Sequence, residues 1–149
     1  HFLGVTKEGR SAIVSTKGNE DCHLILRGGK TPNYDAAGVE AACKELAASG
    51  LAGEVMIDCS HANSKKQYKL QLEVAADVAG QLGSGEDRII GVMVESHLHE
   101  GRQDLTPGTT LAYGKSITDA CLGWEDTRVL LNILAAGVRT RRHSQQHGN

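Results

Sequence analysis

Three side chains that could bind a metal ion lie in separate stretches of this sequence: His61, Glu95 and Asp119. A neutral imidazole and two carboxylates suit a borderline divalent ion such as Mn, Fe, Co or Zn. Taken singly, each residue has a simpler explanation. His61 could be a hydrogen-bonded core histidine, Glu95 a helix-capping carboxylate and Asp119 part of an Asx-turn. A metal site therefore requires that the fold bring these three stretches together.

The segment that contains His61 changes abruptly from apolar to polar. Residues 55–57 are apolar and predict a buried strand, and polar side chains follow at once: Asp58, Ser60, His61 and Asn63. In parallel α/β sheets, ligands bind at the carboxyl ends of the strands, which is where these side chains would lie. A Ser-His-Asp triad within this segment is not expected, because adjacent strand residues point to opposite faces.

A second candidate site is the sequence Arg27-Gly28-Gly29-Lys30, at the end of another apolar run. The glycines let the backbone approach a ligand closely, and the two cations could bind a phosphate or carboxylate. The alternative, that this is a solvated basic turn, stays open on these residues alone.

The remaining histidines and cysteines give weaker signals. His97 and His99 form a pair without further ligands, and His23 falls inside a predicted strand, where a structural role is expected. Cys59 and Cys121 are interpreted as small core residues. The sequence contains no GxSxG elbow, Walker loop or GxGxxG motif.

Strands and helices alternate along the chain. Apolar and alternating runs predict strands over residues 2–6, 11–16, 21–26, 55–57 and 89–94, with a possible hairpin over 11–26. Helices are predicted from Asp35 to Gly50, from Ser64 to Leu82 and from Trp124 onward. Residues 100–114 form an irregular loop, and the polar segment from Arg139 is expected to fray.

This alternation predicts an α/β fold with a parallel sheet. It fits half of a (β/α)8 barrel or a small open sheet, because a complete barrel needs about 250 residues.

The composition is that of a globular domain, and one domain is expected from 149 residues. A net charge of −2 gives no reason to expect nucleic acid or a membrane surface as partner. No apolar run is long enough to span a membrane, and four cysteines without a CxxC pair favour a reduced, cytoplasmic protein. Because the chain starts at His1 inside an apolar run, we expect that residues upstream of it are missing.

Four segments closely resemble the type I 3-deoxy-D-arabino-heptulosonate 7-phosphate (DAHP) synthases: LRGGKTPNYDA, MIDCSHANSKKQ, IIGVMVESHLHEG and LAYGKSITDACLGWEDT. The resemblance implies a (β/α)8 TIM barrel with an extra β-hairpin. Residues 1–142 would be its carboxyl-terminal half, strands five to eight, and residues 143–149 a polar tail.

The resemblance also implies an activity. This family condenses phosphoenolpyruvate with erythrose 4-phosphate, in the first step of the shikimate pathway to aromatic amino acids. Its divalent metal is held by a Cys, a His, a Glu and an Asp, and the last three match His61, Glu95 and Asp119. The Cys belongs to the missing half, and neither Cys59 nor Cys121 replaces it. Arg27 matches the arginine that binds the phosphate of phosphoenolpyruvate, and Asp119 is also expected to contact the aldose.

Regulation and assembly follow from the same resemblance. Phe2, Gly4 and Val14 fall in the pocket for an aromatic amino-acid feedback inhibitor, tyrosine or phenylalanine, and Gly4 leaves more room than a serine, which would favour tyrosine. The alternative is that these are ordinary packing residues. A homo-oligomer is expected. Two other functions stay open: a catalytically inactive half barrel that pairs its sheet edges with another chain, and another metal-dependent aldolase on the same barrel.

Overall fold

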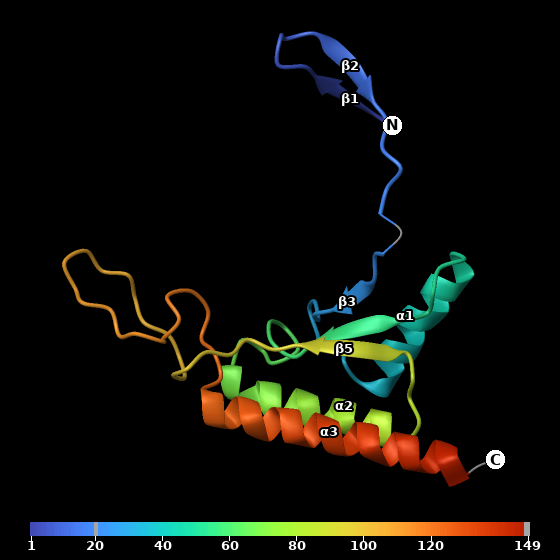
Figure 1. Cartoon of the computed structure of the whole chain (residues 1–149), viewed down its shortest axis with the longest axis vertical. Helices are drawn as coiled ribbons and strands as arrows, with labels where there is room; N and C mark the ends of the chain where they lie inside the picture. The colour runs from blue at the N-terminus through green and yellow to red at the C-terminus, as the bar shows by residue number, and fades with distance from the viewer. Residues whose placement is uncertain (20, 148–149) are drawn as a thin grey trace.

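The computed structural model describes residues 1–19 and 21–147. Its elements follow one another in the order β1 (Phe2–Val5), β2 (Ser11–Val14), β3 (Leu24–Leu26), α1 (Ala36–Ala48), β4 (Val55–Asp58), the 3-10 helix η1 (Tyr68–Leu70), α2 (Gln71–Gly83), β5 (Ile89–Met93) and α3 (Trp124–His147). Figure 1 shows the β1–β2 hairpin standing away from the remaining elements, which gather around one sheet.

That sheet is parallel, as the alternation of strands and helices predicts. Its strand order is β3-β4-β5, and β4 pairs with both neighbours. The central strand is the most buried, since Val55 and Ile57 have no exposed surface. Parallel strands need crossover connections, which α1 and α2 supply.

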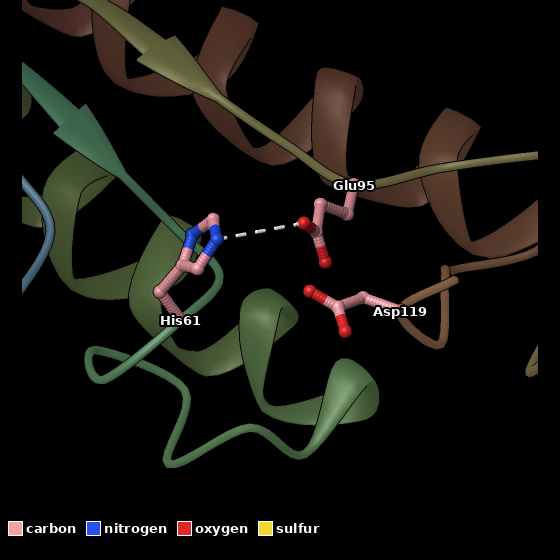
Figure 2. A group of neighbouring side chains, drawn as sticks. All are labelled: His61, Glu95 and Asp119. Atoms are coloured by element: carbon pink, nitrogen blue, oxygen red, sulfur yellow. Dashed lines mark ion pairs between the residues drawn. The ribbon is translucent and has the colours of Figure 1, made fainter.

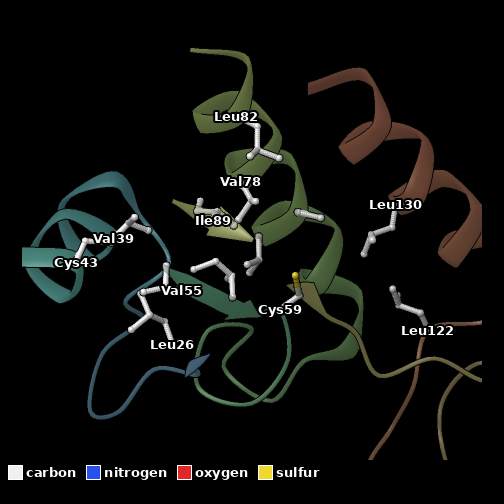
Figure 3. Close-up of a cluster of buried hydrophobic side chains, with 13 residues drawn as sticks. Leu26, Val39, Cys43, Val55, Cys59, Val78, Leu82, Ile89, Leu122 and Leu130 are labelled. Carbon is white, nitrogen blue, oxygen red and sulfur yellow. The ribbon is translucent and has the colours of Figure 1, made fainter. Parts of the chain in front are cut away.

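One apolar core joins the sheet to the helices. It contains Leu26, Val55 and Ile89 from the strands, together with Val39 from α1 and Val78 from α2 (Figure 3). The helix α3 lies alongside α2 and adds Leu130 to the same core. The fold is therefore a mixed α/β unit in which the central strand is held rigidly from several sides. None of the helices in the part of the chain described is long and apolar enough to cross a membrane.

The predicted hairpin over residues 11–26 is wrong. The strand β2 pairs antiparallel with β1, with Phe2 opposite Val14, whereas β3 pairs with β4. A tight turn explains the choice: Gly9 has a left-handed φ of 79°, its N–H donates to the Thr6 carbonyl, and the Thr6 N–H donates to the Arg10 carbonyl. In a hairpin the turn type and loop length fix the register of the two strands.

The first helix agrees with the prediction. The carboxylate of Asp35 accepts from the Gly38 N–H at 2.9 Å and caps α1, and Gly50, with a φ of 70°, follows its end. Asp and Gly are typical of these two positions.

The second helix begins later than predicted, at Gln71 instead of Ser64. His61, Lys65 and Lys66 have φ values of 48°, 52° and 59°, which an α-helix cannot contain. The segment forms a tight turn instead, closed by the Lys66 N–H donating to the His61 carbonyl at 2.8 Å.

The polar segment from Arg139, expected to fray, is helical through His147. Arg141 anchors it by donating to the Glu86 carbonyl at 2.8 Å, just beyond the end of α2. This contact between distant parts of the chain has no local sequence signal. Residues 148–149 of the predicted tail lie outside the described residues.

Two helical glycines make a matched test of the α2–α3 packing. A Cβ at Gly137 would lie 2.5 Å from the Ala79 carbonyl oxygen, whereas a Cβ at Gly80 would meet nothing within 4 Å. Gly137→Ala should therefore lower the free energy of unfolding by about 1–3 kcal/mol, because the helix backbones must separate. Gly80→Ala should raise it by about 0.5–1 kcal/mol, because alanine is the better helix former. Urea denaturation of both variants measures the difference, and shifts of the same sign would contradict the close helix contact.

Candidate metal centre

His61, Glu95 and Asp119 converge at one point. One potential ligand atom from each lies within 4.8 Å of those from the other two. Figure 2 shows the three side chains pointing toward one another from three separate parts of the chain: the turn after β4, the segment after β5 and the loop before α3. The fold therefore brings the three stretches together, as a metal site requires.

The imidazole of His61 is oriented by the residue that ends β4. Its Nδ1 lies 2.7 Å from Oδ2 of Asp58, which is only 3% exposed. The other Asp58 oxygen accepts from the Ser60 N–H at 2.8 Å. An Nδ1–H donated to Asp58 leaves the Nε2 lone pair free, and Nε2 lies 3.8 Å from Oε1 of Glu95. A carboxylate behind a histidine is the usual support of a metal-binding imidazole.

Glu95 is held through both its backbone and its side chain. The fully buried amide of Gln71 donates to the Glu95 carbonyl at 3.0 Å and accepts from the Glu95 N–H at 2.9 Å. The hydroxyl of Ser60 donates to Oε2 of Glu95 at 2.9 Å. Sequence reasoning missed Gln71, whose only signal is a polar residue at the start of an otherwise apolar helix face.

The loop that carries Asp119 is tied to the segment that carries Glu95. Leu122 donates to the Glu95 carbonyl at 3.0 Å, and Gly101 and Cys121 exchange two backbone hydrogen bonds at 2.8 and 3.1 Å. Asp119 is exposed and lies in an irregular loop. These hydrogen bonds nevertheless hold the residues that follow it in place.

The charges of the cluster fit a cation. Among the described residues, neither Glu95 nor Asp119 has an ion pair with a lysine or arginine. Two carboxylates held close together without a counter-charge repel each other, and a divalent ion would relieve that repulsion. The set of one nitrogen and carboxylate oxygens suits Mn, Fe, Co or Zn.

The cluster forms one wall of a hollow of about 320 Å³, and Arg27 lines the same hollow. Asn63, 3% exposed, fixes the Arg27 loop by donating to the Leu26 and Asp58 carbonyls at 3.0 and 2.8 Å. The predicted anion-binding residue therefore lies beside the predicted metal ligands. A larger hollow, of about 760 Å³, lies at the opposite end of β5, where Arg88 pairs with Glu86 and Glu40 at 2.7 Å.

The cysteines near the site keep their protons. Burial, with a smaller effect from the Asp58 charge, raises the pKa of the fully buried Cys59 to about 12. Burial also raises the pKa of Cys121. A thiol with a raised pKa is a poor metal ligand at neutral pH. Cys59 belongs to the apolar core, as predicted, whereas Cys121 is half-buried and lies outside that core, so its interpretation as a core residue is wrong.

Among the described residues, the other histidines considered as candidates, His23, His97 and His99, lie outside the cluster. His97 accepts from the Leu98 N–H at 2.8 Å through its own Nδ1. The prediction that His23 is a structural residue within a strand is wrong, because β3 starts at Leu24 and His23 is exposed.

Comparisons with known proteins agree on one family. A family model described as "DAHP synthetase I family" matches residues 1–132. The Phe-sensitive phospho-2-dehydro-3-deoxyheptonate aldolase of Escherichia coli K12 is 62% identical over 95% of this chain and 40% of its own length. The tyrosine-inhibited aldolase of Schizosaccharomyces pombe is 52% identical over 97% of this chain and 40% of its own length.

A solved structure of a protein with the same name is similar to this chain in fold. The phospho-2-dehydro-3-deoxyheptonate aldolase of Francisella tularensis SCHU S4 matches with a TM-score of 0.83 and 43% identity, over 95% of this chain and 41% of that chain. The chain thus spans about 40% of the length of these relatives.

Proposed function

Because this chain belongs to the DAHP synthetase I family, we propose that it is part of a phospho-2-dehydro-3-deoxyheptonate aldolase (DAHP synthase). The complete protein would condense phosphoenolpyruvate with erythrose 4-phosphate as a metal-dependent transferase. The convergence of His61, Glu95 and Asp119 beside Arg27 is the observation that supports this most. The chain alone would be inactive, since the fourth metal ligand and much of the substrate site would belong to the rest of the protein.

We propose that the fold is the carboxyl-terminal half of a (β/α)8 barrel with an added hairpin. The parallel strands β3, β4 and β5, with their crossover helices, support it, as does the site at their carboxyl ends. Residues 1–142 would form this half. Residues 143–149 would be a polar extension, of which 143–147 continue α3.

The metal would be held by Nε2 of His61 and by carboxylate oxygens of Glu95 and Asp119. An ion bound there would supply Lewis acidity toward the aldehyde oxygen of erythrose 4-phosphate. Asp58 would keep the imidazole in the ligating tautomer, and Gln71 and Ser60 would hold Glu95 in place.

Arg27 would bind the phosphate of phosphoenolpyruvate through two parallel hydrogen bonds from its guanidinium. That grip would orient the enol so that its terminal carbon attacks the aldehyde carbon. Water would then add to C2 of the former enol, and the resulting hemiketal phosphate would lose inorganic phosphate. Asp119 lies at the open side of the cluster and would contact the aldose.

The test is an assay of the complete protein. With both substrates it should release phosphate and form DAHP, lose this activity in a chelator and regain it with a divalent ion. Activity with other aldehydes but not with erythrose 4-phosphate would favour a different aldolase. A complete protein that binds metal but turns over neither substrate would favour the inactive, chain-pairing alternative.

We propose that the β1–β2 hairpin contributes to a feedback-inhibitor pocket. Phe2 lies opposite Val14, and a Cβ at Gly4 would lie 3.1 Å from Val14 and 3.9 Å from Phe2. These three residues thus share one face, and the absence of a side chain at Gly4 lets Val14 lie close to its backbone. Relatives are named Phe-sensitive and tyrosine-inhibited. Inhibition of the complete protein by tyrosine more than by phenylalanine is expected, and indifference to both would leave these as packing residues.

The complete protein is proposed to be a cytoplasmic homo-oligomer. The four free cysteines of the described residues support a reducing compartment. The exposed apolar side chains of the hairpin, Phe2 and Ile13 among them, support association with another chain.

A further inference from the structure

Lys66 lines the same hollow as Arg27 and the three proposed metal ligands. Its side chain is exposed to the solvent. Within residues 1–19 and 21–147, its ammonium has neither an ion pair nor a hydrogen bond. Arg27 is likewise exposed and without an acidic partner in that part of the chain. Two cationic residues without an acidic partner in the described part of the chain therefore line the hollow that holds the carboxylates.

The backbone of Lys66 is fixed with respect to the proposed metal centre. Its N–H donates to the carbonyl of His61 at 2.8 Å, and its φ of 59° is rarely adopted by a residue with a side chain. The turn between them rests on Asn63 and Ser64, which are 3% and 0% exposed. The side chain therefore starts from a defined point at the rim of the hollow, unlike that of a lysine on a mobile loop.

With a metal ion bound beside the carboxylates, the charges of Arg27 and Lys66 remain available for a ligand. A divalent ion would balance the two negative charges of Glu95 and Asp119. Arg27 and Lys66 then contribute two positive charges, and a phosphate monoester carries about −1.5 to −2 near neutral pH. A strongly anionic substrate group would thus complete the balance.

We propose that Lys66 is a further substrate-binding residue, which contacts a phosphate or carboxylate of the substrates held beside the metal. This inference rests on the proposed function. The anion could belong to phosphoenolpyruvate or to erythrose 4-phosphate, and the ammonium is suited to either as a point charge.

Lys66→Met in the complete protein tests the inference, with Lys65→Met as the matched control. Lys65 is also exposed and left-handed, with a φ of 52°, but does not line the hollow. Lys66→Met should raise KM for one phosphate substrate at least tenfold, while kcat and metal content change little. The substrate whose KM rises identifies the anion. Lys65→Met should stay within twofold of the unmodified protein, and Lys66→Arg should recover much of the affinity.

Calorimetric titration with one substrate at a time measures binding without turnover, because condensation needs both substrates. It is done with both the metal-free and the metal-loaded protein. Equal affinities of the Lys66→Met and Lys65→Met proteins for both substrates would overturn the role of Lys66. An unmodified protein that binds the substrates but lacks synthase activity would overturn the proposed function instead, and the titration would still decide the role of Lys66.

Discussion

Replacement of His61 by alanine is expected to abolish metal-dependent turnover of the complete protein. The substitution removes the only nitrogen donor among the three proposed ligands, His61, Glu95 and Asp119. Losing a residue that merely supports a ligand typically costs 10–100-fold. Losing the ligand itself should therefore cost more than about 100-fold in kcat/KM. Bound metal, measured by inductively coupled plasma mass spectrometry after dialysis, should fall in parallel.

His23→Ala is the control for this variant, because His23 is exposed and lies outside the cluster. It should keep both metal and activity. Asp58→Ala should fall between the two, since it removes the carboxylate 2.7 Å from Nδ1 and leaves the ring in place. Normal turnover and metal content in His61→Ala would remove this histidine from the site.

Replacement of Gly28 by alanine is expected to destabilise the protein and disturb Arg27. Gly28 has a φ of 75°, and a Cβ there would lie 2.8 Å from the Cβ of Ala62 and 3.0 Å from the Asn63 N. A left-handed alanine costs about 1–2 kcal/mol. Forcing a methyl group into a filled site adds about 1–3 kcal/mol. We therefore expect the free energy of unfolding to fall by at least about 2 kcal/mol.

Gly29→Ala is the matched control, because a Cβ at that position meets nothing within 4 Å and its φ is not left-handed. Denaturation midpoints of the two variants measure the stability difference. The Gly28→Ala variant should also show a raised KM for phosphoenolpyruvate. Gly28 directly follows Arg27, which lines the hollow, so a shift of the backbone at Gly28 would move Arg27. Equal stability of the two variants would mean that the loop relaxes freely and does not fix the guanidinium.

Elements with local signals could be predicted from the sequence. The apolar run 55–57 and the cap residue Asp35 each depend on neighbouring residues, and both agree with the structure. The candidate ligands were also identifiable by type, since His61 and Glu95 directly follow apolar strands. The residue types could not show that the three side chains meet at one point. Their meeting depends on hydrogen bonds between the segments that contain Glu95 and Asp119.

The errors have two physical causes: a left-handed backbone at residues other than glycine, and contacts between residues far apart in the chain. Lys65 and Lys66 adopt left-handed backbones without being glycine, so the sequence reads as helix where a turn forms. The last turns of α3 are polar and gain order from Arg141 reaching the end of α2. The role of Gln71 was missed for the same reason, because its two hydrogen bonds with Glu95 join residues far apart in the chain.

Anomalous diffraction at the absorption edge of a bound divalent metal, measured from crystals of the complete protein, would locate the metal relative to His61, Glu95 and Asp119. We expect one anomalous peak within about 2 Å of Nε2 of His61 and of carboxylate oxygens of Glu95 and Asp119, with Arg27 lining the same hollow. A metal bound elsewhere, with these three side chains unliganded, would contradict it.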